Sequence, residues 1–160
     1  MGRVAGLGEL RTIRAGLRRE GKRVVFTNGV FDLIHRGHVE YLTKAKALGD
    51  VLIVGVNDDA SVRRIKGSKR PLVEEADRAF IVANLSPVDY AVLFSEDTPF
   101  ELISAIVPDV LVKGADWKVG DIVGKDVVEK AGGKVSNIDI VPDRSTTAIV
   151  DRILKRFSGS

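Results

Sequence analysis

The sequence predicts an α/β protein in which a parallel sheet of about five strands carries helices on both faces, the doubly wound arrangement. Apolar runs of strand length alternate with amphipathic stretches of helix length along the chain. The run Val51–Asn57 is almost wholly apolar, which is typical of a strand covered on both sides. With 160 residues, 44% hydrophobic and 29% charged, the chain is long enough for one domain with its own core.

The elements are expected in a regular order. A leading helix at about 8–20 precedes a core of about 22–156. The predicted strands lie at 24–27, 51–57, 91–94, 110–112 and about 134–141. The predicted helices lie near 37–48, near 74–85, after Thr98 and from about 146 onward. Because no repeat or linker divides residues 1–160, we expect a single domain with a flexible tail at 158–160.

Two of these helices carry specific expectations. Thr98 and Glu101 have the spacing of a capping box, Pro99 would take the first helical position, and Pro108 would end the helix. In the last helix, apolar side chains recur at helical spacing, and we expect them to face the core. They are Ile149, Val150, Ile153, Leu154 and Phe157.

Composition excludes several classes of protein. The formal net charge is only +3, and the cationic clusters at 11–19 and 63–70 are separate in sequence, so we expect no nucleic-acid partner. The apolar runs are of strand length and the N-terminus lacks an apolar signal core, which favours a cytoplasmic protein without membrane contact. The absence of cysteine excludes a disulfide framework, a thiolate metal site and a cysteine nucleophile.

The richest segment chemically is the exit of the first strand, residues 27–38. It holds both histidines, His35 and His38, which are three residues apart and can share one side of a first helical turn. Gly29 permits close approach of a ligand, and Gly37 leaves room for a phosphate at the helix start. Imidazoles can donate hydrogen bonds to phosphate oxygens during phosphoryl transfer. The segment predicts a phosphate site; a zinc site, which would need Asp32 as third ligand, is less favoured.

Two later strand exits suit the same ligand. Arg144 and Ser145 precede the last helix, where a guanidinium and free N–H groups can bind phosphate, although an ordinary helix cap would explain the serine alone. Lys113–Trp117 follows the fourth strand. Trp117 there could cover a base or a sugar, or could be a partly buried packing residue.

The cationic segment 63–70 is expected to form a loop after the second strand. In the functional interpretation Lys66, with Lys69 or Arg70, closes over the phosphates like a lid. In the simpler interpretation the loop is merely solvated. Asp58 and Asp59, at the end of the strand, are expected to cap the next helix rather than to bind metal.

The segment 27–38 resembles the signature of the cytidylyltransferase-like nucleotidyltransferases, whose hallmark His-x-Gly-His is here His35-Arg36-Gly37-His38. Lys113–Trp117 and Arg144–Thr147 resemble further motifs of that family. Together with 48–63 and 94–99, these motifs are most similar to the adenylyltransferases of ADP-heptose synthesis, over about 8–156. Two departures are Val30, where those enzymes usually carry cysteine, and the less similar segment 118–133.

The resemblance implies a Rossmann-like fold and direct transfer of AMP from ATP to D-glycero-β-D-manno-heptose 1-phosphate, with release of pyrophosphate. It implies that His35, His38, Lys66 and Arg144 are the catalytic residues. The nucleotide contacts that it implies are Thr27, Asn28, Gly29, Val30, Phe31, Gly37, Lys113, Gly114, Asp116, Trp117, Ser145, Thr146 and Thr147. Mg²⁺ would be held by the nucleotide phosphates, with no metal site on the protein.

The expected partners are small molecules, a nucleoside triphosphate and a sugar phosphate, and a separate heptose kinase is the expected functional partner. A homodimer stays open. The alternatives within the family are glycerol-3-phosphate cytidylyltransferase and, more distantly, FAD synthetase. An alternative of a different class is a nucleotide-binding regulatory module that has lost catalysis.

Overall fold

The computed structural model describes residues 1–158. Its six strands form one sheet in the order β1-β4-β3-β2-β5-β6, and every pairing in it is parallel. The strands are β1 (Arg3–Val4), β2 (Val24–Gly29), β3 (Val51–Asn57), β4 (Tyr90–Phe94), β5 (Val110–Gly114) and β6 (Lys134–Ile138). The expectation of about five strands missed β1. Two residues are too short to show a period, and β1 exists only because it pairs with Tyr90 and Ala91 at the sheet edge.

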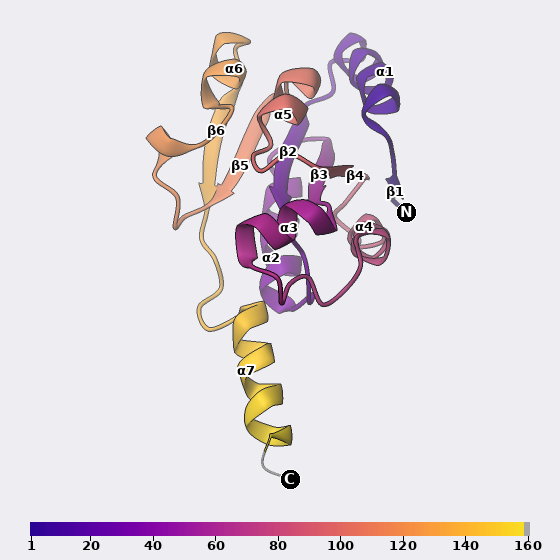
Figure 1. The fold of residues 1–160 in the computed structure, drawn as a ribbon. Coiled ribbons are helices and arrows are strands. Elements are labelled where there is room, and N and C mark those ends of the chain that lie inside the picture. The colour runs from indigo at the N-terminus through magenta and orange to yellow at the C-terminus, as the bar shows by residue number, and fades with distance from the viewer. Residues whose placement is uncertain (159–160) are drawn as a thin grey trace.

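Helices cover both faces of the sheet, as predicted (Figure 1). They are α1 (Leu7–Arg19), α2 (Arg36–Lys46), α3 (Asp59–Lys66), α4 (Glu75–Ala83), α5 (Phe100–Ile106), α6 (Lys125–Lys130) and α7 (Thr146–Phe157), with a short 3₁₀ helix at Val119–Asp121. One core cluster joins the sheet to α2 and α4 through Leu42 and Val82. The other joins it to α1 and α5 through Leu10 and Ile103.

The strand order reverses between β2 and β5. From β2 the chain runs outward through β3 to β4, then α5 carries it back across the opposite face to β5 and β6. Ligands of such sheets bind beyond the carboxyl ends of the strands at the point of reversal. The fold therefore directs attention to the ends of β2 and β5, after Gly29 and Gly114.

The segment after β3 is a helix where the sequence predicted a cationic loop. Asp58 caps α3, because its Oδ1 accepts a hydrogen bond from the Ser61 N–H at 2.7 Å, which confirms the capping role expected for this residue. Val62 is buried, and Arg63, Arg64 and Lys66 occupy the last turn, where cations are favourable. The loop begins only at Gly67, whose φ is 95°.

The predicted capping box of α5 is wrong. Pro99 is the N-cap residue rather than the first helical residue, and no side chain caps the helix. The helix ends at Ile106, and the cap residue Val107 is left-handed, with φ 46°. The spacing of Thr98 and Glu101 was therefore coincidental.

The orientation predicted for α7 is also wrong. None of its side chains is buried, and Ile153, Leu154 and Phe157 are 47%, 56% and 74% exposed. The helix starts beside α2 and projects away from the body of the domain (Figure 1). Of the tail 158–160, residues 159–160 lie outside the described residues. Within 1–158, no helix has both the length and the apolar character needed to cross a bilayer.

The cap of α3 provides a test of this local structure. Replacing Asp58 with Ala should lower the free energy of unfolding by about 1 kcal/mol, because the Ser61 N–H loses its acceptor. Asp97→Ala is the matched control: it removes only an exposed ion pair between Asp97 and Arg64 of the same helix, and should change stability by less than about 0.5 kcal/mol. Urea denaturation measures both, and equal losses would contradict the capping role.

Candidate active site

The two histidines lie at the start of α2, directly beyond β2. His35 is the N-cap residue, with extended backbone (φ −140°, ψ 170°), and His38 lies in the first turn. The rings stack with their centroids 3.9 Å apart, and the His35 N–H donates to His38 Nδ1 at 3.4 Å. Because Nδ1 accepts, the proton of a neutral His38 is left on Nε2, which can donate to a ligand.

Both imidazoles are neutral at pH 7 in the free protein. Burial lowers the pKa of His38 to about 4, and the neighbouring His35 contributes. Burial also lowers the pKa of His35, with a further contribution from the Arg144 guanidinium. The fixed positive potential at this point therefore comes from Arg144 and from the N-terminus of α2, while the imidazoles act as hydrogen-bond donors.

A side chain at position 29 or 37 would crowd its neighbours. A Cβ on Gly37 would lie 3.0 Å from the His35 ring and 3.2 Å from the Cβ of Arg144. A Cβ on Gly29 would lie 3.0 Å from the Phe31 ring. The small size of Gly37 thus leaves room for the His35 ring and lets Arg144 lie against the start of α2.

The N-terminus of α7 meets the same place. Thr146 Oγ1 donates to the carbonyl of Leu33 at 3.3 Å, which ties the start of α7 to the segment before His35. Ser145 caps α7 by accepting from the Ala148 N–H at 3.1 Å, so its hydroxyl has the ordinary capping role. Two helix N-termini therefore converge beyond β2, and Thr147 is exposed beside them.

Lys113 joins β5 to β2 across the point where the strand order reverses. Its Nζ donates to Asn28 Oδ1 and lies 5.7 Å from the centre of the Trp117 ring. Burial lowers the pKa of Lys113 to about 8, although the Asp116 carboxylate acts in the opposite direction. Trp117 is 48% exposed, so part of its side chain is accessible to a ligand.

Other predicted residues lie in different surroundings. Thr27 is fully buried, and its hydroxyl is bonded to the Tyr41 hydroxyl at 2.8 Å and to the Val112 carbonyl at 3.0 Å, so it supports the site from within the sheet. Lys66 is exposed at the end of α3, and no contact found among residues 1–158 joins it to the histidines or Arg144. Arg70 is turned inward to Asp32, with 2.7 Å between Nε and Oδ2.

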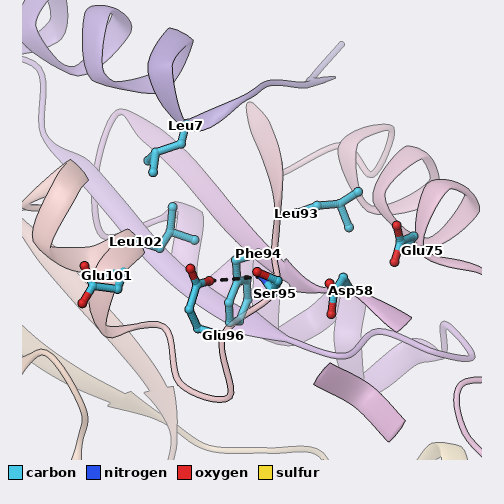
Figure 2. Close-up of a pocket in the computed structure, with 9 residues that line it drawn as sticks. All are labelled: Leu7, Asp58, Glu75, Leu93, Phe94, Ser95, Glu96, Glu101 and Leu102. Carbon is cyan, nitrogen blue, oxygen red and sulfur yellow. Dashed lines mark hydrogen bonds between the residues drawn. The ribbon is translucent and has the colours of Figure 1, made fainter. Parts of the chain in front are cut away.

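A cavity of about 270 Å³ lies beyond the ends of β3 and β4 (Figure 2). Four of its lining residues are carboxylates: Asp58, Glu75, Glu96 and Glu101. Carboxylates repel a triphosphate, so this cavity does not suit the phosphates, and the histidines are not part of its lining.

The sequence pattern of the cytidylyltransferase-like family matches residues 26–155, which contain the histidine turn, the Lys113 segment and the start of α7. The chain belongs to this family. The chain is 57% identical over 148 residues to the bifunctional protein HldE of Syntrophotalea carbinolica, covering 92% of this chain and 30% of that protein. The identity to the HldE protein of Geobacter metallireducens is 54% over 155 residues, covering 97% and 32%.

Solved structures agree with the fold. A lipopolysaccharide core biosynthesis protein of Thermoplasma volcanium has a TM-score of 0.63 and 32% identity, covering 76% of this chain and 98% of that one. The pantoate-β-alanine ligase of Francisella tularensis, at 16% identity and a TM-score of 0.63 over 100% of this chain and 80% of that one, shares the fold alone. The chain spans about a third of the length of the HldE relatives it matches. The family membership predicted from the motifs is confirmed.

Neutral His38 predicts a pH-dependent stability. Because its folded pKa, about 4, lies below the unfolded value of 6.5, the unfolded state binds more protons between these two values. Stability should therefore fall as pH drops from about 6.5 to about 4, and should not depend on this group above pH 7. His38→Asn should flatten that slope in urea titrations at pH 5 and pH 7.5. A variant with the full wild-type slope would show that His38 is not the group responsible.

Proposed function

We propose that this chain transfers AMP from ATP to D-glycero-β-D-manno-heptose 1-phosphate, giving ADP-heptose and pyrophosphate. The observation that carries the proposal is the convergence of the N-termini of α2 and α7, with His35, His38 and Arg144, at the point of strand reversal. Backbone donors, a guanidinium and two imidazoles in one place suit a polyphosphate. The choice of ATP and of a heptose phosphate as the substrates rests on the motifs that resemble those of the adenylyltransferases of ADP-heptose synthesis.

The reaction in this proposal is a direct displacement. An oxygen of the acceptor phosphate forms a bond to the α-phosphorus of ATP while the bond from that phosphorus to the bridging α–β oxygen breaks, and pyrophosphate leaves. A phosphate monoester is already ionised near neutral pH, since its second pKa is about 6, so no residue has to act as a base. The protein accelerates transfer by aligning the two phosphates and by stabilising the charge that develops between them.

Each part of the site has a role in that step. His35 and His38 donate to oxygens of the transferring and leaving phosphates, and Arg144 with the N-terminus of α7 binds the triphosphate. The backbone of Gly29, Val30 and Phe31 surrounds the α-phosphate. Lys66 provides a further cation if the end of α3 approaches the bound phosphates.

The exit of β5 forms the wall near the nucleoside. Lys113 is held at Asn28, and the half-exposed Trp117 offers a ring face to the base or the sugar. Mg²⁺, held by the phosphates of the nucleotide, adds charge neutralisation when it is bound. Because the relatives are named bifunctional and are about three times longer, we propose that a heptose kinase supplies the acceptor, as a separate protein or as a linked domain.

The assignment is tested by measuring pyrophosphate release with ATP and CTP, each combined with heptose 1-phosphate and with glycerol 3-phosphate. We expect turnover with ATP and heptose 1-phosphate. Turnover only with CTP and glycerol 3-phosphate would instead support a glycerol-3-phosphate cytidylyltransferase. If ATP binds but no pairing turns over, the chain is a regulatory nucleotide-binding module.

His38 provides the mechanistic test. His38→Ala should lower kcat by about a hundredfold while the Kd for ATP changes only a few-fold, because the charge it stabilises grows in the transition state. Glu40→Ala is the control on the same helix: it removes only the ion pair with the exposed Arg36 and should leave both constants unchanged. Pyrophosphate-release assays give kcat, and calorimetry gives the Kd for ATP. Equal losses in kcat and in affinity would exclude a role of His38 in stabilising the transition state.

A further inference from the structure

Arg78 and Asp32 are among the charged side chains that are buried outside the set of residues expected to touch phosphate. Arg78 is 0% exposed and Asp32 is 3% exposed. An isolated buried charge is strongly unfavourable, so such groups persist only when they are paired and hydrogen-bonded. Their partners show what these two residues hold together.

Asp32 ties the segment after β2 to the segment between α3 and α4. Its Oδ1 accepts from the backbone N–H groups of Leu72 at 2.8 Å and Val73 at 2.9 Å. Its Oδ2 lies 2.7 Å from Arg70 Nε, which makes an ion pair without the geometry of a hydrogen bond. The carboxylate therefore faces residues 70–73.

Arg78 ties the same two segments together from a second side. Its Nη1 donates to the carbonyls of Val30 and Asn57, both at 2.7 Å. Its Nε donates to the carbonyl of Val73 at 2.8 Å, and its Nη2 pairs with Asp59 at 2.8 Å. Only the planar fork of a guanidinium can serve four acceptors in these directions at once.

Between these two anchors lies a strained turn, Val30–Asp32, which we call the strap. Phe31 at its centre has φ 51°, a left-handed conformation that is rare for an aromatic residue and persists only where the surroundings impose it. Arg78 holds the strap by the carbonyl before Phe31, and Asp32 holds it by the side chain after Phe31. The Phe31 ring contacts His38, with 5.3 Å between the centroids.

We propose that Asp32 and Arg78 are positioning residues for nucleotidyl transfer. They fix the strap, and through Phe31 they fix the ring of His38. Both side chains are buried, and they act through the backbone of the strap rather than on the substrate. This inference rests on the proposed function, in which the strap's backbone surrounds the α-phosphate and His38 donates to it.

Asp32→Asn tests the ion pair with little change of shape. The amide oxygen can still accept from Leu72 and Val73, while the charge opposite Arg70 is lost. We expect kcat to fall about tenfold to a hundredfold, as small misplacements of reacting groups do, and the KM for ATP to change less than about threefold. Removing the uncompensated cation as well, in Asp32→Asn/Arg70→Gln, should recover several-fold of the lost kcat.

Asp97→Asn is the matched control, because it removes the charge from an exposed ion pair with Arg64 of α3 and does not touch the strap. Arg78→Lys is the second variant: it keeps the charge, loses the fork and should shift kcat in the same direction. Far-UV circular dichroism and melting temperature confirm that the variants are folded. A lower melting temperature with unchanged kcat in the folded Asp32→Asn protein would overturn the proposal.

A measurement that needs no acceptor substrate distinguishes a failure of this inference from a failure of the proposed function. The imidazole ¹⁵N resonances of His38 should shift in folded Asp32→Asn and stay unchanged in Asp97→Asn. If wild-type protein turned over no acceptor, the proposed function would fail, yet the shift would still test the link from Asp32 to His38. Unchanged His38 resonances in Asp32→Asn would overturn the positioning role whatever the substrate is.

Discussion

The reversal of strand order between β2 and β5 is the constraint on which the rest of the structure depends. It separates the carboxyl ends of two parallel strands and leaves a place that helices can enter only by their N-termini. The helix after β2 begins there with His35, and α7 is drawn to the same point by the bond from Thr146 to the Leu33 carbonyl. Anion binding thus follows from the topology before any particular side chain is considered.

Charge at this point is arranged by burial as much as by residue type. The histidines are held neutral in the free protein, so the fixed positive charge rests on Arg144 and the helix ends, while Lys113 is kept partly desolvated beside Asn28. Beneath the surface, Asp32 and Arg78 hold a strained backbone segment in place. In the proposed site, an outer set of donors binds phosphate and an inner set of charges positions the outer one.

Local sequence signals predicted the elements whose causes are local. Three features could be predicted from the sequence because each depends on neighbouring residues: the apolar run of β3, the cap at Asp58 and the histidine turn. What could not be predicted depends on distant partners. β1 exists only through its pairing with β4, and the buried bonds of Asp32 reach residues 40 and 41 positions away. The periodicity of α7 was read correctly as amphipathic, but a period does not say whether the chain provides a surface to cover the apolar face.

In the proposed mechanism, the N-termini of α2 and α7 form one phosphate site. Titration of ¹⁵N-labelled protein with a non-hydrolysable ATP analogue tests it directly, because backbone amides at a helix N-terminus respond to a bound phosphate. A shared site predicts large shifts at Gly37 and His38 of α2 and at Thr146 and Thr147 of α7, all following one Kd. Shifts confined to one helix, or centred on the acidic cavity beyond β3 and β4, would contradict it.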